Sequence, residues 1–152
     1  MRILAVSIAA LVASGAAMAQ SGPWQSVVQT DPITDEKSVI AVTQANDYIA
    51  LFIGCTNGTI YAGATTTYFD VEFGDYRTVT WRVDDNAPVS EAWENLEHGG
   101  AAVYDEPGLA FARQVRQAKT RVVVKSGSDT QVFSVRGSTA EVGKVLDACG
   151  HD

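Results

Sequence analysis

The sequence predicts a mainly β, α+β domain that has an antiparallel β-sandwich-like core and two helices. Short apolar runs alternate with polar residues and are separated by turn-forming pairs, which is typical of half-buried strands. Two later segments instead repeat their apolar residues at helical spacing. The two cysteines, Cys55 and Cys149, predict a disulfide that ties the C-terminal helix to the sheet.

The first 19 residues have the pattern of a secretory signal peptide. Met1 and Arg2 precede an apolar run, and small residues end in Ala17-Met18-Ala19, a typical cleavage site. Position 20 is Gln, where a lipoprotein carries the lipidated Cys. No later stretch approaches the roughly 20 apolar residues that a membrane-spanning helix requires. We therefore expect a signal peptide over 1–19 and a single β-rich domain over 20–152, periplasmic or secreted and without a membrane anchor.

The first predicted hairpin pairs residues 39–44 with residues 48–54 around Asn46-Asp47. Its second strand alternates in period two, which places three apolar side chains on one face: Ile49, Leu51 and Ile53. Asn57-Gly58 predicts a tight turn into a further strand over 59–62, because this pair favours the positive φ angles of hairpin turns.

The clearest strand covers residues 77–84. Three apolar residues alternate there with polar ones: Val79, Trp81 and Val83. Asp85-Asn86 predicts a turn into a strand over 88–94, which would place Trp93 on the same core face as Trp81.

After Pro107 the apolar residues recur at helical spacing. Phe111, Val115 and Ala118 predict a helix of about ten residues. Strands over 121–125 and 131–136 follow, linked by the polar residues 126–129. Ser138 and Glu141 then match the Ser-x-x-Glu capping box of a final helix.

That final helix has one apolar side, and Cys149 falls on it, so we expect its thiol to face the core. The other members of this side are Val142, Val145 and Leu146. A disulfide to Cys55 would close a long loop and restrict the unfolded chain by roughly 4 to 5 kcal/mol on the loop-entropy model. The alternative is a redox-active or nucleophilic thiol. Such a thiol needs a Cys-x-x-Cys spacing or a nearby base, and the sequence shows neither.

Charge is divided unevenly along the chain. Residues 20–106 contain 14 acidic and 3 basic residues, whereas residues 107–152 contain 4 acidic and 7 basic ones. The basic cluster that results suits an anionic partner such as a polymer, a lipid head group or an acidic protein surface, although charge runs are more often a solvated face. It comprises Arg113, Arg116, Lys119, Arg121 and Lys125. The acidic balance of the whole chain argues against nucleic acid as a partner.

No catalytic motif is present, so we expect no enzyme, no cofactor and no metal site. The chain lacks Gly-x-Ser-x-Gly, His-Glu-x-x-His and a phosphate-binding glycine loop, and it has only two histidines, His98 and His151. A calcium site at Asp70, Glu72 and Asp75 is conceivable, but its spacing matches no EF-hand loop.

The order of these anchors resembles the VasI-type family of type VI secretion-associated proteins, and more weakly the invasion-associated locus B family of exported proteins. The residues that carry the resemblance span almost the whole mature chain: Trp24, Pro32, Asp35, Val39, Leu51–Cys55, Val79–Asp84, Trp93, Phe111, Val122–Val124, Phe133, Gly137 and Cys149. The resemblance implies an exported accessory protein with a β-sandwich-like core, and it implies no active-site residues.

Two functions remain as expectations. The first is a non-catalytic envelope binding or accessory protein, whose partner is an envelope or secretion-apparatus protein. Its partner-binding residues would come from two regions: Arg82 and Asp84, and Arg113, Arg116, Lys119 and Arg121. The second is a small envelope hydrolase or hydrolase inhibitor, in which His98 would meet nearby acids such as Glu94 or Glu97 and a tyrosine, Tyr61 or Tyr76, in a cleft.

Overall fold

The computed structural model describes residues 22–66, 75–97 and 99–151. The predicted signal peptide, His98 and two of the three calcium candidates, Asp70 and Glu72, lie outside these ranges. In chain order the elements are β1 (Gln25–Thr30), β2 (Lys37–Asn46), β3 (Ile49–Thr56), β4 (Thr59–Thr66), β5 (Tyr76–Val83), β6 (Val89–Asn95), β7 (Ala101–Tyr104), α1 (Asp105–Arg116), β8 (Val122–Ser126), β9 (Asp129–Phe133) and α2 (Ser138–Ala148). The predicted mainly β fold with two helices is confirmed.

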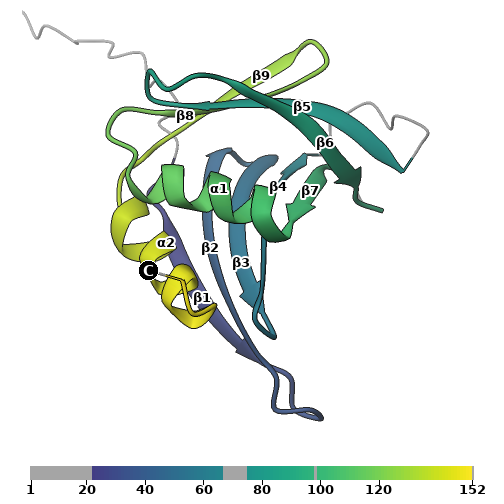
Figure 1. Ribbon diagram of the computed structural model, residues 1–152, viewed down its shortest axis with the longest axis vertical. Coiled ribbons are helices and arrows are strands. Elements are labelled where there is room, and N and C mark those ends of the chain that lie inside the picture. The colour runs from purple at the N-terminus through teal and green to yellow at the C-terminus, as the bar shows by residue number, and fades with distance from the viewer. Residues whose placement is uncertain (1–21, 67–74, 98, 152) are drawn as a thin grey trace, which may run out of the picture.

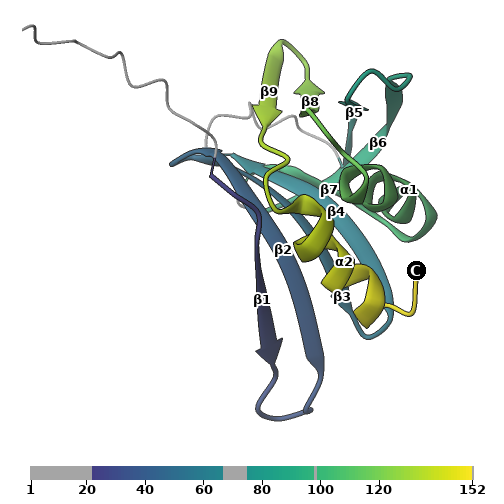
Figure 2. The same cartoon turned by 90° about the vertical axis from the view of Figure 1, so that its left-hand side faces the viewer.

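The nine strands within the described ranges form one antiparallel sheet in the order β1-β2-β3-β4-β7-β6-β5-β8-β9. The layers expected of a sandwich are two halves of this continuous sheet, β1–β4 and β5, β6, β8 and β9, which bend around the helices (Figures 1 and 2). β7, a short strand that the sequence did not predict, joins β4 to β6 between the two halves.

The two ends of the sheet approach each other beside α2. The backbone N–H of Trp24, just before β1, donates to the carbonyl oxygen of Arg136, just after β9, at 2.9 Å. The indole Nε1 of Trp24 donates to the carbonyl oxygen of Ser134 at 2.8 Å. β9 also contacts β2. These bonds join the start of the described chain to its last quarter.

Helix α1 packs between the two halves of the sheet. It contacts β4 and β7 on one side. On the other side the Phe111 ring meets the rings of Trp81 on β5 and Trp93 on β6, both edge-on, with centroid distances of 4.9 and 5.9 Å. The indole Nε1 groups of both tryptophans donate to one oxygen of Glu91, at 2.8 and 3.1 Å. The predicted shared core face of Trp81 and Trp93 is therefore confirmed.

Helix α2 lies across β1, β2 and β3 and contacts α1 (Figure 2). Val142, Val145 and Leu146 are buried, as predicted. Cys149, directly after the helix, forms a disulfide with Cys55 on β3, with 5.7 Å between their Cα atoms. The bond ties the C-terminal helix to the sheet, which confirms the predicted pairing.

The predicted capping box of α2 is wrong. Gly137, with φ +83°, occupies the position before the helix, and Ser138 is already helical. The Ser138 hydroxyl is buried and has no hydrogen-bond partner among the described residues. The Glu141 carboxylate instead accepts hydrogen bonds from the Ser26 hydroxyl on β1 and from the Lys144 ammonium. The turn from β9 into α2 requires a left-handed residue, which glycine adopts at no steric cost.

Smaller differences concern element ends. The first hairpin turns at Asp47 and Tyr48, one residue later than predicted. Asn57 and Gly58 have φ angles of +51° and +76°, which confirms the predicted turn. β1 was not predicted.

Among the described residues, neither helix is long and apolar enough to cross a bilayer.

Candidate functional site

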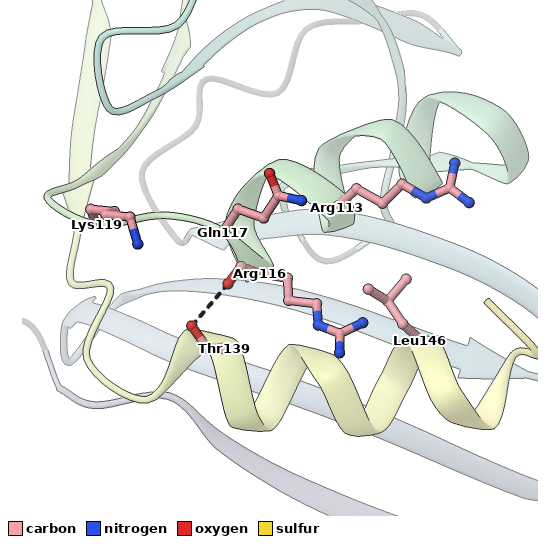
Figure 3. A pocket seen from close by; sticks show the side chains of 6 residues that line it. All are labelled: Arg113, Arg116, Gln117, Lys119, Thr139 and Leu146. Atoms are coloured by element: carbon pink, nitrogen blue, oxygen red, sulfur yellow. Dashed lines mark hydrogen bonds between the residues drawn. The ribbon is translucent and has the colours of Figure 1, made fainter. Parts of the chain in front are cut away.

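Three cations of the predicted basic cluster line a groove between α1 and α2, which we call the basic groove. It is open, has a volume of about 680 Å³ and is lined by Arg113, Arg116, Gln117, Lys119, Thr139 and Leu146 (Figure 3). The helical period explains why Arg113 and Arg116 lie on the same face of α1. The opposite side of α1 is buried and carries Leu109, Ala112 and Val115.

Helix α2 provides the other wall of the basic groove. The Thr139 hydroxyl donates to the carbonyl oxygen of Arg116 at 2.9 Å and thereby satisfies a free carbonyl at the end of α1. The Arg116 guanidinium lies against α2 at Gly143, where a side-chain Cβ atom would stand 3.6 Å from its Nε. This is an ordinary contact distance, so the guanidinium packs against α2 without requiring glycine at this position.

The three cations of the basic groove have no acidic partner among the described residues. The remaining members of the predicted set behave differently. Arg82 and Arg121 both approach Asp85, at 3.9 and 3.8 Å. Because the Asp85 side chain is 95% exposed, both pairs are weak. Arg113, Arg116 and Lys119 thus line one groove without forming an ion pair among the described residues, on a chain whose formal net charge is −7.

The cations at the end of α1 also have a structural explanation. Arg113 and Arg116 lie in the last turn of the helix, and Asp105 and Glu106 lie in the first. This distribution complements the helix dipole, which is typically worth about 0.3–1 kcal/mol per charge at an exposed site. The dipole accounts for basic residues in this turn. It does not account for Lys119, which lies beyond the helix and borders the same groove.

Asp84 holds the segment that carries Lys119. Its carboxylate accepts hydrogen bonds from the backbone N–H groups of Thr120 at 2.8 Å, Lys119 at 2.9 Å and Arg121 at 3.2 Å. The Thr120 hydroxyl adds a fourth bond at 2.9 Å. These bonds, the Thr120 backbone bond foremost, lower the pKa of Asp84 to about 2. The carboxylate is thus engaged within the chain and fixes the position of Lys119.

A second, smaller hollow adjoins the basic groove. It has a volume of about 390 Å³ and shares Gln117 and Lys119 with the groove. Asp84, Asp85 and Asn86 border its other side, and the Asn86 amide donates to the Gln114 side chain at 3.0 Å. The turn after β5 and the end of α1 therefore form one continuous polar surface.

The structure brings together Arg113, Arg116 and Lys119, and it places Arg82 and Arg121 beside Asp85. Sequence reasoning missed Thr139, Gly143 and Leu146, the α2 side of the groove. Their spacing of four and three residues marks one helical face. The crossing of α2 over α1, which brings that face to the cations, leaves no local signal in the sequence.

Among the residues named for a hydrolase site, Tyr61 lies on β4, Tyr76 on β5 and Glu94 on β6. Glu97 lies in the turn after β6, and His98 lies outside the described residues. Tyr76 stands opposite Glu94 in the β5–β6 register, and both side chains are exposed. Tyr61 stands opposite Tyr104 between β4 and β7, with 6.3 Å between ring centroids. Partial burial, helped by the charge of Glu94, raises the pKa of Tyr104. Within the described ranges no three His, Cys, Asp or Glu side chains gather as a metal site would require.

Comparison of the chain with protein-family models, curated proteins and solved structures finds no match. The fold and the site define an antiparallel, disulfide-linked α+β domain with a cationic interhelical groove. Its function is therefore inferred from this geometry.

Proposed function

We propose that the protein is a non-catalytic, exported binding protein that holds an acidic protein partner in the basic groove. The observation that carries the proposal is that Arg113, Arg116 and Lys119, without acidic partners among the described residues, line one groove between two packed helices. An acidic surface supplies the charge that this groove lacks.

Three features support a binding role. The groove is positioned by rigid elements, since α1 is packed against both halves of the sheet and α2 is fixed by the disulfide. Asp84 fixes the Lys119 backbone, so little ordering of the main chain is needed when a partner binds. Cations on a negatively charged chain also orient an approaching acidic partner toward one face and raise its association rate.

The cellular setting is part of the same proposal. The N-terminal pattern supports export, and a disulfide is typical of an oxidising compartment such as the periplasm. The resemblance to the VasI-type family extends the proposal to a partner in the type VI secretion apparatus, with other envelope proteins as the broader class.

A labelled ten-residue polyglutamate peptide tests the groove directly. Fluorescence anisotropy is measured for the wild type and for Arg113→Glu/Lys119→Glu. Both side chains are exposed and neither makes a hydrogen bond within the described chain, so folding should be retained. The matched control Lys125→Glu/Arg136→Glu changes the net charge equally at two exposed positions outside the groove.

We expect the groove variant to bind the peptide at least about tenfold more weakly, a loss of about 1.4 kcal/mol, while the control stays near the wild type. Crosslinking capture from envelope extract with the same three proteins would then identify the natural partner. Equal binding by the groove variant and the wild type would refute the proposal. An equal loss in both variants would assign the binding to net charge instead.

A further inference from the structure

A second charged feature lies at the tip of the long β1–β2 hairpin. Residues 31–36, which we call the acidic loop, connect β1 to β2 and carry three carboxylates: Asp31, Asp35 and Glu36. Figures 1 and 2 show this hairpin extending well beyond both helices, so that its tip projects from the body of the molecule.

The acidic loop is held in one conformation by its own hydrogen bonds. The Asp31 carboxylate accepts from the backbone N–H groups of Ile33 and Thr34, at 2.7 and 3.0 Å. The backbone N–H groups of Asp31 and Asp35 donate to the carbonyl oxygens of Glu36 and Asp31, both at 2.9 Å. The carboxylate bonds keep Asp31 ionised, since they lower its pKa.

The loop presents an apolar side chain among these charges. Ile33 is 90% exposed. A preorganised loop loses little conformational entropy on binding. Nearly all of the free energy gained by burying its isoleucine can therefore stabilise the contact. The loop therefore has two properties of a docking element, a charge of one sign and an exposed apolar anchor.

The basic groove is complementary to this loop. It offers three cations to the three carboxylates, and the aliphatic parts of Arg113 and Arg116 offer apolar surface to the isoleucine. Because the loop projects away from the helices of its own chain, it is presented to other molecules.

We propose that the acidic loop of a second copy of this chain occupies the basic groove. This proposal rests on the proposed function, because it adds a competitor for the same groove. Loop and groove are different surfaces, so the contact is heterologous: each copy keeps one free loop and one free groove, and association continues head to tail. An acidic partner would then displace the loop and return the protein to monomers.

Complementary variants test this arrangement. The loop variant Asp35→Asn/Glu36→Lys keeps Asp31, which orders the loop, and places Asn where φ is +59°, a backbone conformation that Asn tolerates. The groove variant is Arg113→Glu/Lys119→Glu. Matched controls change exposed charges elsewhere, in Asp129→Asn/Asp147→Lys and Lys125→Glu/Arg136→Glu.

Sedimentation velocity at about 10 µM to 1 mM, the range of weak interfaces, gives the readout. We expect the wild type and both controls to gain average mass with concentration, and each variant alone to remain monomeric. An equimolar mixture of the loop and groove variants should form a species of twice the monomer mass and nothing larger, because only one intact loop and one intact groove are present. Sodium chloride at about 1 M, which shortens the screening length to about 3 Å, should weaken the association.

Two results would overturn this inference. One is a wild type that stays monomeric throughout the range. The other is association that persists in both variants, which would place the contact elsewhere, such as the exposed β1 edge. The polyglutamate titration separates this failure from failure of the proposed function. If the loop variant binds the peptide but no mixed dimer forms, only the second-copy proposal is wrong; if the wild type and the loop variant both fail to bind the peptide, the proposed function is wrong as well.

Discussion

Replacing Cys55 and Cys149 with alanine removes the covalent link between β3 and the end of α2. The two residues are 94 positions apart, so the disulfide closes a loop that contains most of the domain. On the loop-entropy relation, a loop of this length lowers the entropy of the unfolded chain by about 16 cal/mol/K, or about 4.7 kcal/mol at 25 °C. We expect the double variant to lose most of this stability.

Equilibrium urea denaturation followed by tryptophan fluorescence measures the effect. With an m value of about 1.5 kcal/mol/M, a loss of about 4.7 kcal/mol lowers the midpoint by about 3 M. The m value itself should rise in the variant, because an unfolded chain without the crosslink exposes more surface. Wild-type protein reduced with dithiothreitol is the matched control, and its midpoint should fall close to that of the double variant.

A loss below about 1.5 kcal/mol in both the variant and the reduced protein would refute the reasoning. It would mean that the unfolded state retains structure that already restricts the chain. A large loss in the variant with no loss on reduction would instead assign the effect to the substituted side chains.

Four further substitutions test individual contacts. Ser138→Ala should leave stability unchanged or raise it by about 1 kcal/mol in urea denaturation, since its buried hydroxyl has no partner among the described residues, whereas loss of a true cap costs about that amount. Gly143→Ala should stabilise α2 by up to about 1 kcal/mol, because the added Cβ finds ordinary contact distances; a loss of stability would contradict this geometry. Glu91→Ala leaves two buried indole N–H groups without their acceptor and should cost about 2–4 kcal/mol, with a shift in tryptophan emission; an unshifted spectrum at wild-type stability would count against the shared acceptor. The pKa of the Asp84 carboxylate is lowered, so its contribution to folding stability is complete above pH 3.8 and is lost as the pH falls toward about 2. The stability of Asp84→Asn should therefore depend less on pH in this range. Parallel stability profiles of the variant and the wild type would contradict the role of Asp84.

Local patterns predicted the elements whose burial repeats with a regular period. Alternation identified the strand containing Trp81, and the Asn57-Gly58 pair identified the turn between β3 and β4, because these features depend only on neighbouring residues. β1 and β7 were missed for opposite reasons. β1 is an exposed edge strand with no buried face, and β7 has only four residues, too few to establish a period.

The capping box failed because two local signals competed for one position. Ser138 and Glu141 have the spacing of a cap, but the chain arriving from β9 must turn through a left-handed residue, and Gly137 supplies it. Ser138 is therefore already inside the helix rather than before it, and its side chain is buried in the core.

The basic groove was predictable only in part. The sequence identifies its cations, because α1 places every third or fourth residue on one face. It does not distinguish Arg113 and Lys119, which border the groove, from Arg121, which lies beside Asp85. That distinction depends on the crossing of α1 and α2 and on the Asp84 carboxylate holding the segment beyond α1, and both are long-range contacts.

The bonds between Trp24 and the segment after β9 have a consequence for the order of folding. The Trp24 indole and its acceptor at Ser134 are separated by 110 residues, and the disulfide spans a comparable distance. A chain that emerges N-terminus first presents β1 long before the residues that close the sheet beside it. Contacts of such long sequence separation form slowly, so folding should be completed only after release of the C-terminal helix. Until then β1 and the Trp24 side chain remain open to pairing with other chains, and a truncated or stalled chain should be prone to aggregation.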